Sequence, residues 1–305
     1  FGMAACVIAA GCSMRLSTPP RLSASGNTQR RRGFRPLLQD WPHIPAAYPY
    51  RWEYEGSPKS QALAAARELE TTIRQVGAET VAAFIAEPVG GASIPAAQPH
   101  PAYYREIRRI CREYNVLFIA DEIMTGFGRT GDWFACRQAR VQPDIVCLAK
   151  GITGGFLPLA ATVATDEIFE SFVSDDPMTT FYHGHSYTAN PLGCAAALKS
   201  MELLEWNEYQ FKGLEDIHRE QVRMLVEDLP HVKRPRVKGS VAAVDIQVEE
   251  EGYLSKVGQV IRREARKRNL LLRPLGNILY ILPPYCIGEE ELKDAYATIA
   301  LILEP

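Results

Sequence analysis

Three ionisable residues each follow a short apolar run in the first half of the chain. Glu87 comes after VAAFIA, Asp121 after VLFIA and Lys150 after IVCLA. Such runs predict buried strands, and a charge at the end of a buried strand costs free energy unless it has a partner. In a parallel sheet the carboxyl ends of the strands meet at one edge, where ligands bind. Three such residues in succession therefore predict a functional site at that edge.

Lys150 and Asp121 together indicate what chemistry this site performs. Lys150 precedes the flexible turn GITGG, which leaves room for a bulky group beside its amine. A buried lysine is a nucleophilic amine suited to forming a Schiff base, because desolvation favours its neutral form. A buried aspartate is what a pyridine nitrogen needs to stay protonated and act as an electron sink. We therefore expect both side chains to be buried and interpret the pair as a site for pyridoxal 5'-phosphate.

Helical patterns alternate with these strands. A helix is predicted from Ser57-Pro58 to Gly77 and another over 101–114, and a fourth strand over 159–164. This alternation predicts an α/β fold with a mostly parallel sheet. The final third is more charged, and its expected helices and strands cover residues 213–227, 241–248, 253–267, 270–273, 278–282 and 289 onward.

Three parts of the chain are expected. Residues 1–30 are interpreted as a truncated or divergent arm. Residues 31–205 form an incomplete large domain that binds the cofactor, and residues 206–305 form a small carboxyl-terminal domain. The boundary is set near Trp206, where the composition becomes more charged.

Composition excludes several classes of partner. A net charge of -2 gives no reason to expect nucleic acid or an anionic membrane, and no apolar run approaches the roughly 20 residues needed to span a bilayer. The seven cysteines are scattered and never arranged as CxxC, which predicts reduced thiols and a cytoplasmic location.

Other polar residues are given structural interpretations. His183 and His185 form an HxH, but no carboxylate or thiol cluster accompanies them, so no metal site is expected. Arg129 is expected to stabilise the glycine-rich loop that follows Asp121. Arg234 and Arg236 are interpreted as part of a solvated basic face.

Four segments resemble one known family. They are FIAEPV from Phe84, LFIADEIMTGFGRTG from Leu117, DIVCLAKGITGG from Asp144 and HGHSYTANPLGCA from His183. They resemble class III aminotransferases, and the similarity runs from about Ser23 to the end. The resemblance implies the fold type I architecture, a large domain with a mostly parallel sheet plus a smaller α+β carboxyl-terminal domain. It also implies a homodimer that uses pyridoxal phosphate to move an amino group from a small-molecule donor to a keto acceptor.

The resemblance also assigns roles to single residues. Lys150 would carry the cofactor as a Schiff base and move the proton during transfer, and Asp121 would pair with the pyridine nitrogen. Ser186 matches the Ser or Thr that reaches the phosphate of the cofactor bound to the partner subunit. Glu87 matches a glutamate on the substrate side of the pocket.

The run LLRPLGNILYILPPYCI from Leu271 is the most informative for substrate. It resembles the diaminopelargonate aminotransferases of the biotin pathway, in which the arginine matching Arg273 binds the carboxylate of the acceptor. A guanidinium binds a carboxylate bidentately, which makes this role physically sensible. The expected reaction is amino transfer to the keto-amino acid precursor of diaminopelargonate, with the donor left open between S-adenosylmethionine, lysine and others.

Two alternatives remain open. The segments IPAAQPHP from Ile94 and SASGN from Ser23 resemble omega-amino-acid:pyruvate transaminases. In addition, the Gly-Ser-rich helix start that cradles the phosphate and the aromatic residue that stacks on the ring in the family are not recognisable ahead of Ser23. Helix N-termini are natural phosphate sites, so the second alternative is a truncated, non-catalytic remnant.

Overall fold

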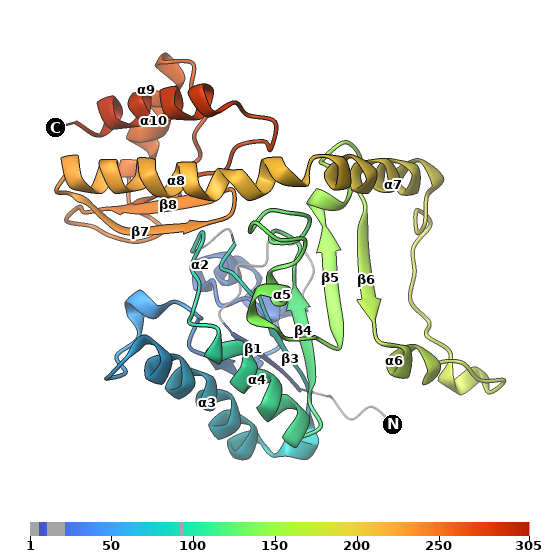
Figure 1. Ribbon diagram of the computed structural model, residues 1–305. Helices are drawn as coiled ribbons and strands as arrows, with labels where there is room; N and C mark the ends of the chain where they lie inside the picture. Colours follow the sequence, from blue (N-terminus) through green and yellow to red (C-terminus); the bar gives the residue numbers. More distant parts are fainter. Residues whose placement is uncertain (1–5, 11–21, 92–93, 305) are drawn as a thin grey trace.

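The computed structural model describes residues 6–10, 22–91 and 94–304. Of the expected amino-terminal arm, residues 1–5 and 11–21 lie outside this description. The described elements form a six-stranded sheet and a three-stranded sheet, here called the large sheet and the small sheet (Figure 1).

The large sheet has the strand order β2-β1-β3-β4-β5-β6. Its strands are β1 (Cys6–Ala10), β2 (His43–Ile44), β3 (Val81–Ala86), β4 (Leu117–Asp121), β5 (Ile145–Ala149) and β6 (Ala160–Ala164). Every neighbouring pair is parallel except β5 and β6. That pair is antiparallel because the connection between them is too short for the crossover that parallel strands need. The predicted α/β fold with a mostly parallel sheet is confirmed.

Helices α3 (Pro58–Val76) and α4 (Ala102–Glu113) lie side by side against the large sheet (Figure 1). The side chain of Ser57 accepts the amide of Ser60 at 3.3 Å and caps α3. Phe84 of β3 and Phe118 of β4 are fully buried in the core between sheet and helices. The shorter helices of this part are α2 (Thr28–Arg31), α5 (Ala135–Ala139) and α6 (Asp166–Glu170), and the longer α7 (Pro191–Trp206) follows them.

The small sheet is antiparallel, in the order β7-β8-β9. Its elements are β7 (Val232–Lys238), β8 (Val241–Ile246), β9 (Ile278–Ile281), α8 (Glu208–Asp228), α9 (Val257–Lys267) and α10 (Glu289–Leu303). A second hydrophobic cluster, with members from Leu214 to Leu303, fills the space between them. The strand expected over 270–273 is absent, since residues 270–274 have no regular pairing.

The prediction that Arg236 lies on a solvated basic face is wrong. This run forms β7, and the side chain of Arg236 is only 3% exposed, with Asp245 of β8 at 2.7 Å. Asp245 gives this inward-pointing charge its partner. The side chain of Arg234 is 38% exposed and also contacts Asp245, at 3.1 Å.

Within the described ranges, every helix is too short or too polar to cross a lipid bilayer.

Candidate active site

The three strand-end residues lie along one edge of the large sheet. β3, β4 and β5 are parallel neighbours in that order. Ala86 pairs with Ala120, and Asp121 pairs with Cys147. Glu87, Asp121 and Lys150 therefore come from the carboxyl ends of three adjacent strands, as the spacing predicted.

Asp121 and Lys150 differ in burial. Asp121 is 3% exposed, and its Oδ1 accepts the amide of Ile123 at 3.1 Å. Lys150, which was expected to be buried, is exposed in the single chain. Its φ of 50° turns the chain out of β5 into a 3-10 turn over residues 150–153. A positive φ is strained for a residue with a side chain, and such strain is concentrated at functional sites.

The glycine-rich loop after Asp121 returns to the turn that carries Lys150. Phe127 of this loop is buried, and a Cβ added to Gly151 would lie 2.9 Å from the Phe127 Cβ. No side chain fits between the two segments, so a glycine after Lys150 is required for this close approach. The loop thus connects the aspartate directly to the lysine turn.

Glu122 is a functional-site neighbour that sequence reasoning missed. It is fully buried, and burial raises the pKa of its carboxyl. Its carboxylate accepts the hydroxyl of Thr125, the amide of Ala135 at 3.1 Å and the amide of Cys136 at 2.8 Å. It therefore ties together the two ends of the glycine-rich loop. The signal available in the sequence was a second carboxylate directly after Asp121.

Arg129 fastens the glycine-rich loop to the small-sheet part of the molecule. It donates to the Ser240 hydroxyl at 3.0 Å and to the Pro283 carbonyl at 2.9 Å. It also lies over the Tyr285 ring, 4.5 Å from the centroid, and the Tyr285 hydroxyl donates to the Phe127 carbonyl at 2.7 Å. These contacts agree with the structural interpretation of Arg129.

The remaining candidates lie in different settings. Glu87 is partly buried, and its carboxylate accepts the Gly91 amide at 3.1 Å. Ser186 lies on an exposed segment ahead of α7, and Arg273 lies on an exposed loop ahead of β9. The single chain therefore brings Glu87, Asp121 and Lys150 to one edge and leaves Ser186 and Arg273 on exposed loops.

The residues at the strand ends suit pyridoxal phosphate. A buried carboxylate can hold a proton on a pyridine nitrogen, and the amine of a lysine that directly follows the next strand can form a Schiff base with an aldehyde. In the part of the chain that the structure describes, no three His, Cys, Asp or Glu side chains come together as a metal site would require.

Comparison with known proteins identifies the family. The family model described as aminotransferase class-III matches residues 17–303. The chain belongs to the class III aminotransferases. It is 48% identical over 257 residues to the adenosylmethionine-8-amino-7-oxononanoate aminotransferase of Synechococcus elongatus, a match that covers 84% of this chain and 60% of that protein. The chain thus spans about six-tenths of the length of this curated relative.

The chain is also similar to transaminases with other names. The chain is 36% identical to the putrescine–pyruvate aminotransferase of Pseudomonas aeruginosa, covering 81% of this chain and 55% of that protein. Among solved structures, an (S)-enantioselective omega-transaminase from Thermomicrobium roseum is similar with a TM-score of 0.89 at 31% identity, covering 99% of this chain and 68% of that one. An amine transaminase from an uncultivated Pseudomonas species, solved in a pyridoxal-phosphate-bound form, also has a TM-score of 0.89, with 30% identity over 98% of this chain and 69% of that one.

Proposed function

We propose that this chain takes part in the pyridoxal-phosphate-dependent transfer of an amino group to the keto-amino acid precursor of diaminopelargonate. The observation that carries the proposal is the placement of Asp121 and Lys150 at the carboxyl ends of adjacent parallel strands. The class III membership of the chain supports the same chemistry.

Each residue at the edge has a distinct task in this proposal. Lys150 would attach the cofactor through its amine and, once released, would move a proton between the amino-bearing carbon of the substrate and a carbon of the cofactor. Asp121 holds a proton on the pyridine nitrogen, and its burial strengthens that interaction because little water competes for the carboxylate. The cofactor, when bound, supplies the electron sink for breaking a bond to the amino-bearing carbon. Glu87 directly follows β3, the neighbour of the strand that ends at Asp121, and we propose that it contributes to the substrate side of the site.

Arg273 is proposed to bind the acceptor. A bidentate guanidinium–carboxylate pair would fix the end of a long keto-amino acid that lies away from the reacting carbonyl. The exposed position of Arg273 ahead of β9 leaves its guanidinium accessible to such a ligand. The similarity to the adenosylmethionine-8-amino-7-oxononanoate aminotransferase of Synechococcus elongatus supports this acceptor.

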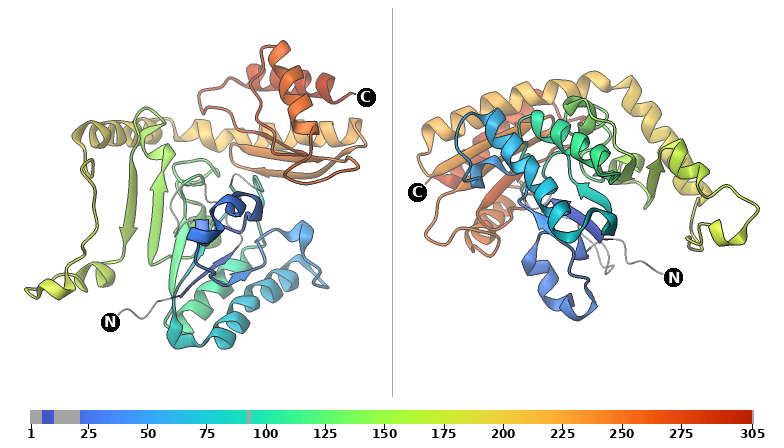
Figure 2. Two further views of the ribbon diagram at one scale, coloured as in Figure 1. Left: turned by 180° about the vertical axis from the view of Figure 1, so that it is seen from behind. Right: turned by 90° about the horizontal axis from the view of Figure 1, so that it is seen from below.

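We propose that the working form is a homodimer. Most of the large hydrophobic side chains that are exposed in the described residues lie between 156 and 209, including Phe156 at 83%, Leu192 at 73% and Trp206 at 64%. Figures 1 and 2 show the chain between β6 and α7 extending away from the body. Ser186 belongs to this segment, so a second copy packed there would bring its Ser186 toward the first copy's cofactor. The same packing would cover the exposed Lys150.

A domain boundary near Trp206 and a cytoplasmic location also belong to the proposal. A boundary near Trp206 is supported by the end of α7 and the start of α8 at Glu208, and by the separate hydrophobic clusters of the two sheets. The scattered cysteines support a reducing cytoplasmic compartment.

A comparison of two acceptors tests the proposed reaction. The biotin precursor and pyruvate are offered separately with S-adenosylmethionine, lysine or putrescine as amino donors, and each product is measured by mass spectrometry. Amination of the biotin precursor is expected. Amination of pyruvate alone would establish the omega-amino-acid alternative, which the Pseudomonas aeruginosa relative favours. No product with any pair would establish the non-catalytic remnant.

A further inference from the structure

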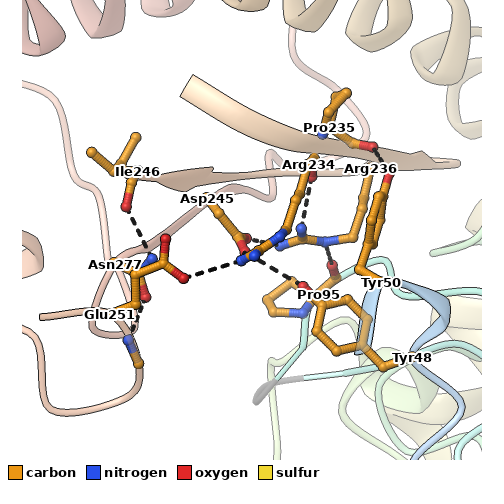
Figure 3. Close-up of polar contacts among 11 residues, drawn as sticks. Tyr48, Tyr50, Pro95, Arg234, Pro235, Arg236, Asp245, Ile246, Glu251 and Asn277 are labelled. Carbon is orange, nitrogen blue, oxygen red and sulfur yellow. Dashed lines mark hydrogen bonds and ion pairs between the residues drawn. The ribbon is translucent and has the colours of Figure 1, made fainter. Parts of the chain in front are cut away.

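Arg236 lies on β7 of the small sheet but reaches across to a loop of the large-sheet part. Its Nη2 donates to Asp245 Oδ1 at 2.7 Å and its Nη1 to the Arg234 carbonyl at 2.7 Å. Its Nε donates to the Pro95 carbonyl at 3.0 Å. Figure 3 shows the guanidinium lying between Asp245 and Pro95. Because all three nitrogens have acceptors and the side chain is buried, the guanidinium is held in a single geometry.

Pro95 belongs to the loop that follows β3 and carries Glu87. Gly90, near the start of this loop, is bonded to its later residues. The Gly90 amide donates to the Ala97 carbonyl at 2.7 Å, and the Gly90 carbonyl accepts the Ala96 amide at 3.0 Å. A Cβ on Gly90 would lie 2.4 Å from a backbone oxygen of the loop, so the closure depends on glycine. Arg236 therefore holds the closed loop from the opposite part of the molecule.

The same network continues toward Arg273. Arg234 donates to Asp245 Oδ2 at 3.1 Å and to Glu251 at 3.2 Å. Asn277 follows Arg273 by four residues, and its Oδ1 accepts the amide of Gly252, the residue after Glu251, at 2.8 Å. The Asn277 side chain also donates to the carbonyl of Ile246, the residue after Asp245, at 2.9 Å. The turn that carries Arg273 is therefore joined to the strand of Asp245, and through Asp245 to Arg236, without depending on Arg234.

We infer that Arg236 is a positioning residue that fixes the Glu87 loop relative to the turn carrying Arg273, and so sets the length of acceptor that the enzyme takes. This inference rests on the proposed function, in which Arg273 binds the far carboxylate and the strand ends hold the reacting carbonyl. Bonds from a charged donor to a buried acceptor are among the stronger hydrogen bonds of a protein. The contact with Pro95 is therefore strong enough to hold the loop in a fixed place.

The network offers a matched pair of variants. Arg236→Met removes one ion pair to Asp245 and the bonds to the Pro95 and Arg234 carbonyls. Arg234→Met removes the other ion pair to Asp245 and the contact with Glu251, and leaves Pro95 held. In either variant Asp245 keeps one arginine, so its carboxylate is not left buried without a partner. Should R236M fail to fold, R236K replaces it in the comparison with R234M. The lysine keeps a cation beside Asp245 but lacks the Nε donor that reaches Pro95.

Hydrogen exchange without cofactor or substrate provides the first measurement. In R236M the amides of Gly90, Ala96 and Ala97 are expected to exchange at least about tenfold faster than in R234M, the factor that corresponds to one charged hydrogen bond. Equal exchange of these amides in the two variants would overturn the inference. Because no reaction is involved, this result is independent of whether the proposed acceptor is correct.

Steady-state kinetics provides the second measurement. R236M is expected to raise KM for the keto acceptor about tenfold with kcat little changed, because Asp121 and Lys150 are not part of the network. R234M is expected to leave KM near that of the unsubstituted enzyme. An equal rise in both variants, or a loss confined to kcat, would show that Arg236 contributes only to general stability.

Discussion

Protonation of His218 should make the stability of the chain depend on pH. His218 of α8 is fully buried, and its Nδ1 lies 2.7 Å from the Tyr296 hydroxyl of α10. Burial lowers the pKa of His218 from 6.5 to about 4. In the unfolded chain the imidazole takes up a proton near pH 6.5, whereas in the folded chain it stays neutral until about pH 4. Between these values acid favours the unfolded state, so the free energy of unfolding falls as the pH falls.

The size of this loss follows from the two pKa values. Each pH unit between them changes the free energy of unfolding by about 1.4 kcal/mol. Between pH 7.5 and pH 4.5 the loss from His218 is therefore about 2.5 kcal/mol. Above pH 7.5 both states hold a neutral imidazole and the contribution is constant. Below pH 4 both states are protonated, so no further loss comes from this residue.

Urea denaturation of a His218→Gln variant measures this contribution. The glutamine does not titrate and offers an acceptor to the Tyr296 hydroxyl. The unsubstituted chain should lose about 2.5 kcal/mol more than the variant between pH 7.5 and 4.5. Protonation of the other groups changes the free energy of unfolding equally in both proteins, so it cancels in this difference. His231→Gln, at a partly exposed histidine, serves as the matched control and should follow the unsubstituted chain. Parallel curves for H218Q and the unsubstituted chain would refute the reasoning.

Three further substitutions test other parts of the molecule. Asp121→Asn should preserve the melting temperature but lower the transamination rate at least about 100-fold; near-normal turnover would assign Asp121 another role. Arg273→Ala should weaken acceptor binding by about one to two orders of magnitude in kinetic assays, and lost stability with unchanged selectivity would contradict this. Gly239→Ala should reduce the free energy of unfolding by about 2 kcal/mol or more, because φ is +57° and its Cβ would lie 2.2 Å from the Gly131 amide nitrogen. An unchanged urea midpoint would show that this contact can relax.

Local sequence patterns were enough to predict the strands that end at Glu87, Asp121 and Lys150. The apolar run before Asp121 and the Ser57-Pro58 helix start both act through neighbouring residues, and the structure has β4 and α3 at these places. The common edge of Glu87, Asp121 and Lys150 followed because parallel strands align their carboxyl ends.

Features that depend on distant contacts were not predictable in the same way. Arg236 is buried because Asp245 on the next strand and Pro95 on the large-sheet part both receive its hydrogen bonds. Nothing within a few residues of Arg236 indicates these partners. The exposure of Lys150 was missed for a related reason, since burial at a strand end depends on what packs against it rather than on the apolar run before it.

Chemical trapping at Lys150 tests the central claim most directly. The protein is incubated with pyridoxal phosphate, reduced with borohydride and digested, and its peptides are mapped by mass spectrometry, with Lys150→Ala as the control. The pyridoxyl mass is expected on Lys150 and should be absent from the control. A pyridoxyl group on another lysine instead, or none on Lys150, would contradict the assignment of this residue as the cofactor lysine.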